Sequence, residues 1–250
     1  MERLDRLMVL RGMSSTRARA ARDIEACGVR VNGTVQRKPG KWVPSDAELA
    51  WESAPMPWVS RGALKLLGAW EVWPELVPVG AWMLDVGAST GGFTEVALAH
   101  GALGVVAVDA GSDQLAPGLR ADDRVRWFDK TQIQSLRRED ITALGVPLPT
   151  YFAVDVSFVS ATRVLGSVEA LMAPDSPAHG VVLVKPQFEV GPQGLGRNGV
   201  VRDARLRQQA LDQVVATARE VGFVAVDWAP SPVTGGDGNA EWLLRLHRPH

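Results

Sequence analysis

From residue 60 to the end of the chain, short apolar runs alternate with segments of helical periodicity. Runs that are apolar along their whole length are typical of strands in a parallel sheet that helices cover on both faces. The sequence therefore predicts an α/β fold of the Rossmann-like kind, in which ligands bind beyond the carboxyl ends of the strands. The runs predicted as strands of this sheet are residues 81–88, 105–111, 124–129, 151–158 and 180–188.

Helical patterns and two late strands complete this prediction. Residues 91–101 have helical spacing after the first strand, and a long helical pattern extends from Ala204 to Val221 after the fifth. The last two apolar runs, residues 223–232 and 241–247, lie close together in the sequence. We therefore expect them to pair as antiparallel strands at an edge of the sheet.

Charge is distributed unevenly along the chain. The net charge is −1, but residues 1–65 contain 12 basic and 7 acidic side chains, a balance of +5, and the remainder contains 15 and 21, a balance of −6. A basic module that contacts a polyanion, joined to a neutral or acidic domain, is one interpretation. The other is that arginine-rich helices simply face solvent.

The composition excludes several classes of protein. Apolar residues make up 46% of the chain and charged residues 22%, so extended disorder is excluded. The single cysteine, Cys27, excludes an internal disulfide framework and a cysteine-built zinc site, and the histidines show no metal-ligand spacing. No apolar run approaches the ~18 residues that a membrane helix needs. We therefore expect a soluble cytoplasmic protein that has no membrane partner and no metal.

The first fifty residues predict two short helices and a small sheet. Leu4, Leu7 and Met8 share a helical face, and a second helix begins at a serine cap, Ser14 or Ser15, and ends at Gly28. The sequence VRVNGTVQ then predicts a hairpin, because the Asn-Gly pair favours the tight turn that joins two strands. A further short strand follows near residue 50.

This order of elements resembles the S4-type RNA-binding module over residues 2–52. In that family the second helix and the following loop contact structured RNA, and arginine suits the task because its planar fork bridges phosphate oxygens. The alternative is an ordinary helical cap with solvated charges. The basic residues predicted to bind RNA are Arg3, Arg17, Arg19, Arg22, Arg37, Lys38 and Lys41, with Arg61 beyond this module.

The proline-rich residues 53–59 carry no periodicity and predict a linker between domains at residues 1–52 and 60–250.

The second domain begins its predicted sheet with the segment LDVGASTGGFTE, residues 84–95. The phosphate-binding G-x-x-x-x-G-K loop is absent, since Phe93 follows Gly92, and the dinucleotide pattern G-x-G-x-x-G also fails. The spacing D-x-G-x-x-x-G-G fits S-adenosylmethionine better. Structural glycines that serve no ligand are the alternative.

Acidic residues at the ends of the next two strands support this cofactor. Asp109 ends the second strand, where a carboxylate can accept both ribose hydroxyls, and Asp129 ends the third, near the expected adenine edge. Lys130, Thr131 and Gln132 follow it. The residues predicted to hold the cofactor are Asp85, Gly87, Ala88, Ser89, Thr90, Gly91, Gly92, Phe93, Asp109, Asp129 and Lys130.

Four charged residues are placed to meet at the same rim. Lys65 lies just before the sheet, Asp155 and Lys185 end the fourth and fifth strands, and Glu241 begins the last apolar run. Two lysines and two carboxylates beside a methyl donor suggest attack by a ribose 2′-hydroxyl, which needs a base or a cation at its proton. Burial and neighbouring positive charge can lower the pKa of a lysine for this task. Ordinary surface ion pairs are the alternative.

These segments together resemble the TlyA family over nearly the whole chain. The matching motifs are VSRG-x-LKL, LDVGASTGGFTE, VDVSF, LVKPQFE, the GVVRD segment at residues 199–203 and SPVTGGDGNAEWLL. Members of the family join an S4-type module to an FtsJ-like methyltransferase domain and methylate cytidine 2′-hydroxyls in 16S and 23S ribosomal RNA. The resemblance implies S-adenosylmethionine as cofactor, ribosomal RNA within ribosomal subunits as partner, and Lys65, Asp155, Lys185 and Glu241 as the catalytic tetrad.

Departures from the family pattern fall at Ala63, Ser112 and Gln132. Three other functions stay open: a non-catalytic binder in ribosome assembly, a membrane-lytic protein as the older name hemolysin suggests, and a methyltransferase that acts on a base. Residues 186–206 form either a mobile loop over the ligand, with Phe188 as a stacking surface, or a solvated connector. Each tryptophan, Trp42 among them, is expected to serve packing.

Overall fold

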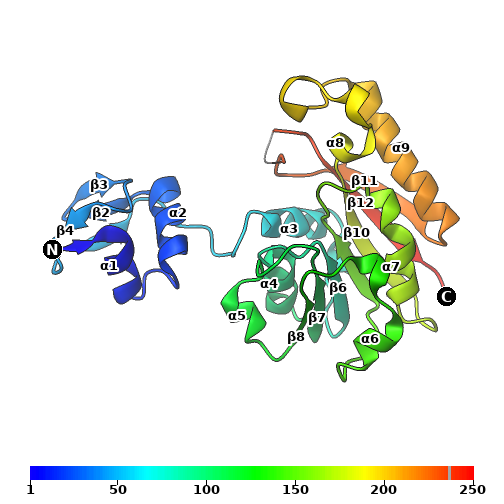
Figure 1. Ribbon diagram of the computed structural model, residues 1–250, viewed down its shortest axis with the longest axis horizontal. Helices are drawn as coiled ribbons and strands as arrows, with labels where there is room; N and C mark the ends of the chain where they lie inside the picture. Colours follow the sequence, from blue (N-terminus) through cyan, green and yellow to red (C-terminus); the bar gives the residue numbers. More distant parts are fainter. Residues whose placement is uncertain (236–237) are drawn as a thin grey trace. The chain divides into compact units, whose positions relative to one another are not determined.

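The computed structural model describes residues 1–235 and 238–250, so Gly236 and Asp237 of the SPVTGGDGNAEWLL segment lie outside the described residues. The chain divides into two compact units, Met1–Pro57 and Trp58–His250 (Figure 1). The domain limits at residues 52 and 60, with a linker between them, stay a prediction.

The N-terminal unit contains two helices and short strands, as the sequence predicts. Helix α2 is capped by Thr16, whose side chain accepts from Arg19 N–H, and not by Ser14 or Ser15. Thr16 is extended and immediately precedes the first helical residue, which is the geometry a cap needs. The elements are β1 (Glu2–Arg3), α1 (Leu4–Leu10), α2 (Arg17–Cys27), β2 (Val29–Val31), β3 (Thr34–Gln36), β4 (Trp42–Val43) and β5 (Leu49–Trp51).

The predicted hairpin joins β2 to β3. Its turn residues Asn32 and Gly33 have φ of 47° and 81°, the left-handed conformation that the turn requires. Strand β2 lies between β3 and β5, and β1 pairs separately with β4. The β1–β4 pair was not predicted, because two residues are too few to show a periodicity.

The second unit is built on a seven-stranded sheet with the order β11-β12-β10-β9-β6-β7-β8. Five neighbouring strands, β10, β9, β6, β7 and β8, are parallel. Strand β12 lies between β10 and the edge strand β11 and is antiparallel to both. The predicted antiparallel pair of the last two strands is thus confirmed. The strands are β6 (Trp82–Val86), β7 (Gly104–Val108), β8 (Val125–Phe128), β9 (Tyr151–Val154), β10 (Ala178–Val184), β11 (Val224–Pro230) and β12 (Trp242–Arg248).

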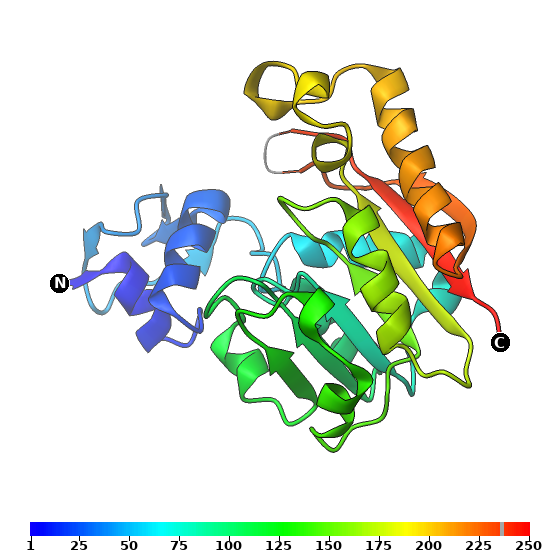
Figure 2. The ribbon, with the colours of Figure 1, turned by 45° about the vertical axis from the view of Figure 1, so that its right-hand side comes forward.

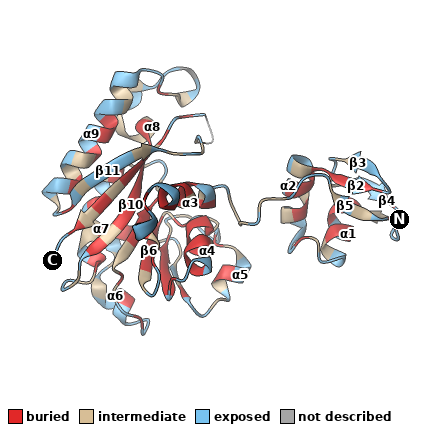
Figure 3. Cartoon of the chain, turned by 180° about the vertical axis from the view of Figure 1, so that it is seen from behind, coloured by how far each residue is buried: buried red, intermediate tan, exposed pale blue. Residues whose placement is uncertain are grey.

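Helices cover both faces of this sheet (Figure 1, Figure 2). One core cluster packs α6, α7 and α9 against the sheet, and the other packs α3 and α4 against its opposite face. The central strands β6, β7, β9 and β10 are accordingly buried along most of their length, as Figure 3 shows in red, whereas the edge strand β11 is mostly exposed. The helices are α3 (Gly62–Val72), α4 (Gly92–Ala99), α5 (Pro117–Arg120), α6 (Arg138–Thr142), α7 (Leu165–Leu171), α8 (Pro186–Glu189) and α9 (Ala204–Glu220).

All five predicted parallel strands end earlier than expected, and two of them do so by four residues. Strand β9 ends at Val154 and β10 at Val184, whereas the apolar pattern continues to residues 158 and 188. Pro186 has no N–H for a sheet ladder and begins the short helix α8 instead. Polar and aromatic residues that follow these strands are thereby released from the sheet at its carboxyl rim. Within the described ranges, no helix is both long and apolar enough to cross a membrane.

Candidate active site

The four residues Lys65, Asp155, Lys185 and Glu241 form a connected set of ion pairs, which we call the tetrad. Lys185 Nζ lies 2.6 Å from Asp155 Oδ1, and Lys65 Nζ lies 3.4 Å from Asp155 Oδ2. Lys65 Nζ is also 2.7 Å from Glu241 Oε2. The structure therefore brings together the four side chains that the sequence placed at one rim.

Each member of the tetrad comes from a different part of the fold. Lys65 lies in the first turn of α3, Asp155 directly follows β9, Lys185 follows β10 and Glu241 precedes β12. Because β9 and β10 are parallel neighbours, the residues after them emerge at the same edge. Strand β12 runs in the opposite direction, so its first residue reaches that edge as well.

The tetrad is nearly shielded from water. The side chains of Lys65, Asp155 and Lys185 are 10%, 16% and 8% exposed, and that of Glu241 is 1% exposed. Buried charges are tolerated when they are paired, and here two cations balance two carboxylates. Ordinary surface ion pairs, the alternative left open by the sequence, do not describe this arrangement.

Two side chains near Lys185 were missed by sequence reasoning. Lys185 Nζ donates to Ser157 Oγ over 2.9 Å, and Phe158 follows Ser157. Phe158 is 94% exposed and has a φ of 64°, a conformation that costs free energy for a bulky residue and is often found at functional sites. Its ring centroid lies 5.5 Å from that of Phe188. The exposed Phe158 and the half-buried Phe188 therefore form an aromatic pair beside the tetrad.

A cleft of about 970 Å³ opens at the carboxyl ends of β6, β7 and β9, and we call it the cofactor cleft. Gly87, Ser89, Asp109 and Asp155 line it. A second hollow of about 440 Å³ contains the tetrad and shares Gly87, Ser89 and Asp155 with the cleft. The two spaces therefore meet at the glycine loop, with the tetrad on the far side.

The carboxylate of Asp109 shapes the wall of the cofactor cleft. Its Oδ2 accepts from Ser89 N–H and its Oδ1 from Gly111 N–H, each over 2.7 Å. Ser89 has a φ of 49°, so the chain turns sharply around this carboxylate. Each carboxylate oxygen has a further acceptor position, so Asp109 can still accept from ligand hydroxyls.

The glycines of the loop are closely packed against other parts of the protein. A Cβ at Gly87, whose φ is 82°, would lie 2.6 Å from the carbonyl oxygen of Asp155. A Cβ at Gly91 would collide with Leu119, and one at Gly92 would collide with the Ser60 hydroxyl. Packing within the protein therefore requires glycine at these three positions.

Asp85 was predicted to bind the cofactor, but the structure does not bring it to the cleft. It is fully buried behind the loop, where its Oδ2 accepts from Thr94 Oγ1 over 2.6 Å and its Oδ1 has no hydrogen-bond partner among the described residues. Burial without a cation raises the pKa of this carboxyl to about 7. Thr94, which sequence reasoning did not single out, is its partner.

The third predicted acidic position, Asp129, lines a small hollow that adjoins the cofactor cleft and shares Ser89, Asp109 and Gln114 with it. Asp129 Oδ1 accepts from Asp113 N–H over 2.9 Å, and neither Asp129 nor Lys130 lines the cleft. The next two residues, Thr131 and Gln132, do line it. One further departure from the family pattern, Ala63, is fully buried in α3, where its N–H faces Gly92.

Ser112, the remaining departure, is exposed and is not among the residues that line the cleft. Among the other loop residues, Ala88, Thr90, Gly92 and Phe93 line the tetrad hollow. Arg61, predicted to bind RNA, belongs to the second unit and lines this hollow too. The residues around the tetrad are therefore drawn from both the predicted cofactor set and the predicted RNA set.

The remaining basic residues predicted to bind RNA lie in the N-terminal unit, and several are held by carboxylates. Arg3 and Arg17 both bond to Asp5, and Arg19 and Arg22 both pair with Asp23. Asp5 is 4% exposed and Asp23 6% exposed. These two carboxylates were not singled out from the sequence, where they look like ordinary members of charged helices.

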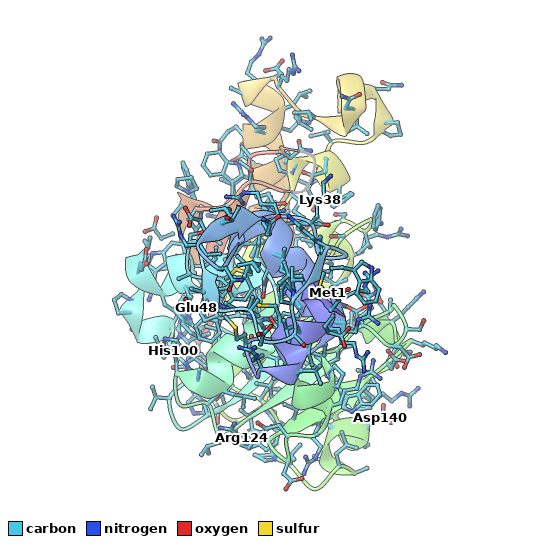
Figure 4. All side chains as sticks on the ribbon, turned by 90° about the vertical axis from the view of Figure 1, so that its left-hand side faces the viewer. Met1, Lys38, Glu48, His100, Arg124 and Asp140 are labelled. Atoms are coloured by element: carbon cyan, nitrogen blue, oxygen red, sulfur yellow. The ribbon has the colours of Figure 1, made fainter. Side chains whose placement is uncertain are left out.

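The other basic residues of this unit are exposed. Arg37 donates to the carbonyl oxygens of Glu25 and Ala26, and Lys41 donates to Gln36. Lys38, labelled in Figure 4, is exposed as well. The expectation that Trp42 serves packing is wrong, since this side chain is 59% exposed and lies on β4 directly opposite Arg3.

Comparisons with known proteins agree with this arrangement. The model of FtsJ-like methyltransferases matches residues 58–248, and the S4 domain model matches residues 2–49. The first match spans the unit that holds the tetrad, and the second lies within the unit that holds the paired arginines. The two matches together span most of the chain.

Full-length relatives share both parts. The 16S/23S rRNA (cytidine-2'-O)-methyltransferase TlyA of Mycobacterium tuberculosis is 41% identical over 245 residues, 98% of this chain and 89% of that protein. Hemolysin A of Brachyspira hyodysenteriae is 33% identical over 245 residues, 98% of this chain and 99% of that protein. A solved structure from Streptococcus thermophilus, described as a putative hemolysin, has a TM-score of 0.75 at 38% identity and covers 99% of this chain and 88% of that one. The chain therefore belongs to the TlyA family of S-adenosylmethionine-dependent methyltransferases, with an S4 domain ahead of an FtsJ-like methyltransferase domain.

Proposed function

We propose that the protein transfers the methyl group of S-adenosylmethionine to the 2′-hydroxyl of cytidine in 16S ribosomal RNA, 23S ribosomal RNA or both. The observation that carries this proposal is the tetrad, in which Asp155 joins two nearly buried lysines at the mouth of the cofactor cleft. The name of the relative from Mycobacterium tuberculosis supports the choice of cytidine and of ribosomal RNA.

The difficult step of this reaction is the loss of a proton from the ribose hydroxyl. S-adenosylmethionine supplies an electrophilic methyl group when it is bound. We assign the contact with the hydroxyl to Lys185 Nζ, which removes or polarises its proton as the oxygen becomes bonded to carbon. Asp155 and Ser157 fix the position of Lys185, with Nζ distances of 2.6 and 2.9 Å.

Lys65 and Glu241 complete the set as a second ion pair. Lys65 contacts both Asp155 and Glu241, so the Asp155 carboxylate is held from two sides. A fixed carboxylate keeps Lys185 aimed in one direction, and positioning of this kind supplies much of the rate when two reactants must align. We therefore assign orientation to Asp155, Lys65 and Glu241.

The cofactor cleft suits a ligand of the size of S-adenosylmethionine, since ligand clefts commonly span ~300–1,000 Å³. We assign the ribose hydroxyls to Asp109 and the methionine end to the backbone near Gly87 and Ser89, which face both the cleft and the tetrad hollow. Asp85 supports the loop from behind. Thr131 and Gln132, which line the cleft, and Asp129, which lines the small hollow beside it, are the residues we assign to the adenine.

The RNA partner is assigned to both units. The arginines and lysines of the S4 domain match phosphate groups, and the exposed ring of Phe158, beside Phe188 and the tetrad, offers a stacking surface for an unpaired base. Ribosomal RNA inside an assembled or assembling subunit is the substrate form we propose. Such a substrate would place the protein in the cytoplasm.

The test uses ribosomal RNA from cells that lack the gene. Purified protein, S-adenosylmethionine carrying a labelled methyl group, and either free 16S and 23S RNA or isolated subunits are incubated and the RNA is mapped by mass. We expect label at cytidine and a linkage that resists nuclease cleavage at the modified nucleotide. Label on a base, with normal cleavage, would instead support a base methyltransferase.

The same preparation separates the remaining alternatives. Calorimetry should show binding of S-adenosylmethionine, and a complete absence of binding with ribosomal RNA or subunits present would favour a non-catalytic assembly protein. Leakage of liposomes at low protein concentration would support the membrane-lytic alternative. Calorimetry and mapping together therefore decide between an enzyme and a binding protein.

A further inference from the structure

Asp5, in the first turn of α1, gathers groups from three separate elements of the S4 domain. Its Oδ1 accepts from Arg3 Nε over 3.2 Å and from Arg6 N–H over 2.8 Å. Its Oδ2 accepts from Arg3 Nη2 over 3.0 Å and from Arg17 Nη2 over 3.1 Å. One carboxylate thus joins β1, α1 and the start of α2.

The Asp5 carboxylate is buried, whereas the two arginine side chains that bond to it are exposed. The Asp5 side chain is 6% exposed, while those of Arg3 and Arg17 are 42% and 56% exposed. A guanidinium carries five N–H groups, so one or two bonds to Asp5 leave others directed elsewhere. Each arginine is therefore anchored on its inner side and open to solvent on its outer side.

The strength of the anchoring is also visible in the protonation of the carboxyl. Hydrogen bonds from Arg3 and then Arg17 lower the pKa of Asp5 to about 2, even though burial acts in the opposite direction. The carboxylate therefore stays charged at every physiological pH, and both arginines keep their partner.

Fixing an arginine before it meets a phosphate has a consequence for binding. A free arginine side chain loses rotamer freedom when it is immobilised in an interface, at ~0.5–1.5 kcal/mol for each such side chain. Arg3 and Arg17 are already held, so this loss is smaller when they contact RNA. A planar guanidinium in a fixed direction also selects the spacing of the phosphates it can reach.

We propose that Asp5 is a positioning residue for RNA, which presents Arg3 and Arg17 as a fixed pair to the phosphates of the ribosomal RNA substrate. The inference rests on the proposed RNA-binding function of this domain. Trp42, exposed and opposite Arg3 in the β1–β4 pair, stands beside the same surface. Asp23 repeats the pattern within α2, where it pairs with Arg19 and Arg22.

The two possible effects of removing Asp5 have opposite signs. Asp5→Asn adds one unit of positive charge, so electrostatics alone predicts tighter RNA binding. Loss of positioning predicts weaker binding, by about fivefold to tenfold for two arginines that become free. Asp46→Asn is the matched control, because Asp46 is an exposed carboxylate of the same unit and its removal changes the net charge equally.

The measurement is a titration of the full-length protein against 16S and 23S RNA transcripts over a range of salt concentrations. We expect Asp5→Asn to bind more weakly than the wild type and Asp46→Asn to bind equally or more tightly. Asp5→Asn binding that matches Asp46→Asn would overturn the inference. If the wild type itself binds neither RNA, the proposed function fails and not the role of Asp5 alone.

A second variant covers the case in which Asp5→Asn unfolds the S4 domain, which circular dichroism would reveal. Arg17→Lys keeps the charge but cannot keep the guanidinium contact to Asp5, so we expect RNA binding to weaken about threefold to tenfold. Arg11→Lys is its control, since Arg11 bonds to the Ser45 carbonyl and to no carboxylate in the described structure. Equal affinities of Arg17→Lys and Arg11→Lys would contradict the proposal.

Discussion

The two units use the same local device, one carboxylate that holds two cations, in different ways. Asp155 holds Lys65 and Lys185, whose side chains are 10% and 8% exposed. Asp5 holds Arg3 and Arg17, whose side chains are 42% and 56% exposed. In the catalytic unit the cations are withheld from water, and in the S4 domain they are anchored but remain open to it.

The type of cation fits the exposure. A lysine amine can lose its proton and is a compact charge, which suits a reacting site that excludes water. An arginine stays charged and offers a fork of donors, which suits phosphates met at a surface. The comparison therefore supports different proposed roles for the two sets of ion pairs: chemistry for the buried lysines and recognition of phosphates for the exposed arginines.

A third carboxylate shows what happens when no cation is present. Asp85 is fully buried with Thr94 as its partner, and its pKa is raised to about 7, whereas the pKa of Asp5 is lowered to about 2. The two residues therefore contribute to the pH dependence of folding with opposite signs. Asp5 stabilises the folded state above pH 4, and this contribution is lost as the pH falls towards 2.

The largest effect, on the rate of methyl transfer, is expected at the buried ion pair of Lys185 and Asp155. Lys185→Ala removes the group assigned to the hydroxyl proton, so methyl transfer should fall by ~10²–10⁴-fold, the usual contribution of a positioned acid or base. RNA binding should be unchanged, because Lys185 is almost buried. Arg219→Ala, at an exposed position of α9, is the control in the same assay. Full methyl transfer by Lys185→Ala would mean that the buried ion pair does not serve the chemistry, and the proposed difference in role between the two units would be lost.

The next largest effect is expected on folding stability at Asp85, the carboxylate that has Thr94 and no cation as its partner. Above pH 4 the unfolded carboxyl of Asp85 is ionised while the folded one resists ionisation, so Asp85 lowers stability increasingly between pH 4 and 7, by on the order of 4 kcal/mol. Asp85→Asn should remove this loss. Thermal unfolding across that range should therefore show a wild type that loses stability relative to the variant as the pH rises, and parallel curves would contradict the assignment.

A smaller effect is expected when two arginines of the S4 domain are replaced by glutamate. The double variant Arg17→Glu and Arg19→Glu should weaken RNA binding by about tenfold or more and flatten its dependence on salt, because fewer counterions are released. Methyl transfer at saturating RNA should persist. The same charge change at Arg124 and Arg126, at the amino end of β8, serves as control. Equal losses in the two double variants would mean that net charge, and not this surface, governs binding.

The smallest effect is expected from the aromatic residue beside Arg3. Trp42→Ala should weaken RNA binding by about fivefold to tenfold, since stacking of a base on an aromatic ring contributes ~1–3 kcal/mol. The dependence on salt should stay as in the wild type, because no charge is removed. A titration at two salt concentrations separates this result from that of the arginine variants. Unchanged affinity would confine recognition to phosphates.

Much of the fold followed from the sequence, because continuous apolar runs and glycine turns are local signals. The five parallel strands, the late antiparallel pair and the Asn32-Gly33 hairpin all appear where they were expected. The strand ends did not, since the apolar pattern continues past Val184 while Pro186 cannot pair. A two-residue pair such as β1–β4 carries no periodic signal at all.

The site was predictable in its members but not in its contacts. Strand ends and family motifs singled out the tetrad, yet only the folded chain shows which oxygen of Asp155 meets which lysine. Asp85 has the same local pattern as a cofactor residue, but tertiary packing turns it inward towards Thr94. Asp5 was missed for the converse reason, because its arginine partners come from other elements.

The close packing of Gly87 against the carbonyl of Asp155 couples the two duties that we propose for this unit, donor binding and acceptor activation. Any side chain at position 87 would press against the backbone that carries Asp155, since even a Cβ would come within 2.6 Å of its carbonyl oxygen. A substitution there would therefore disturb donor binding and acceptor activation together. A change at position 87 cannot alter one of these duties without also altering the other, so few substitutions can be accepted there.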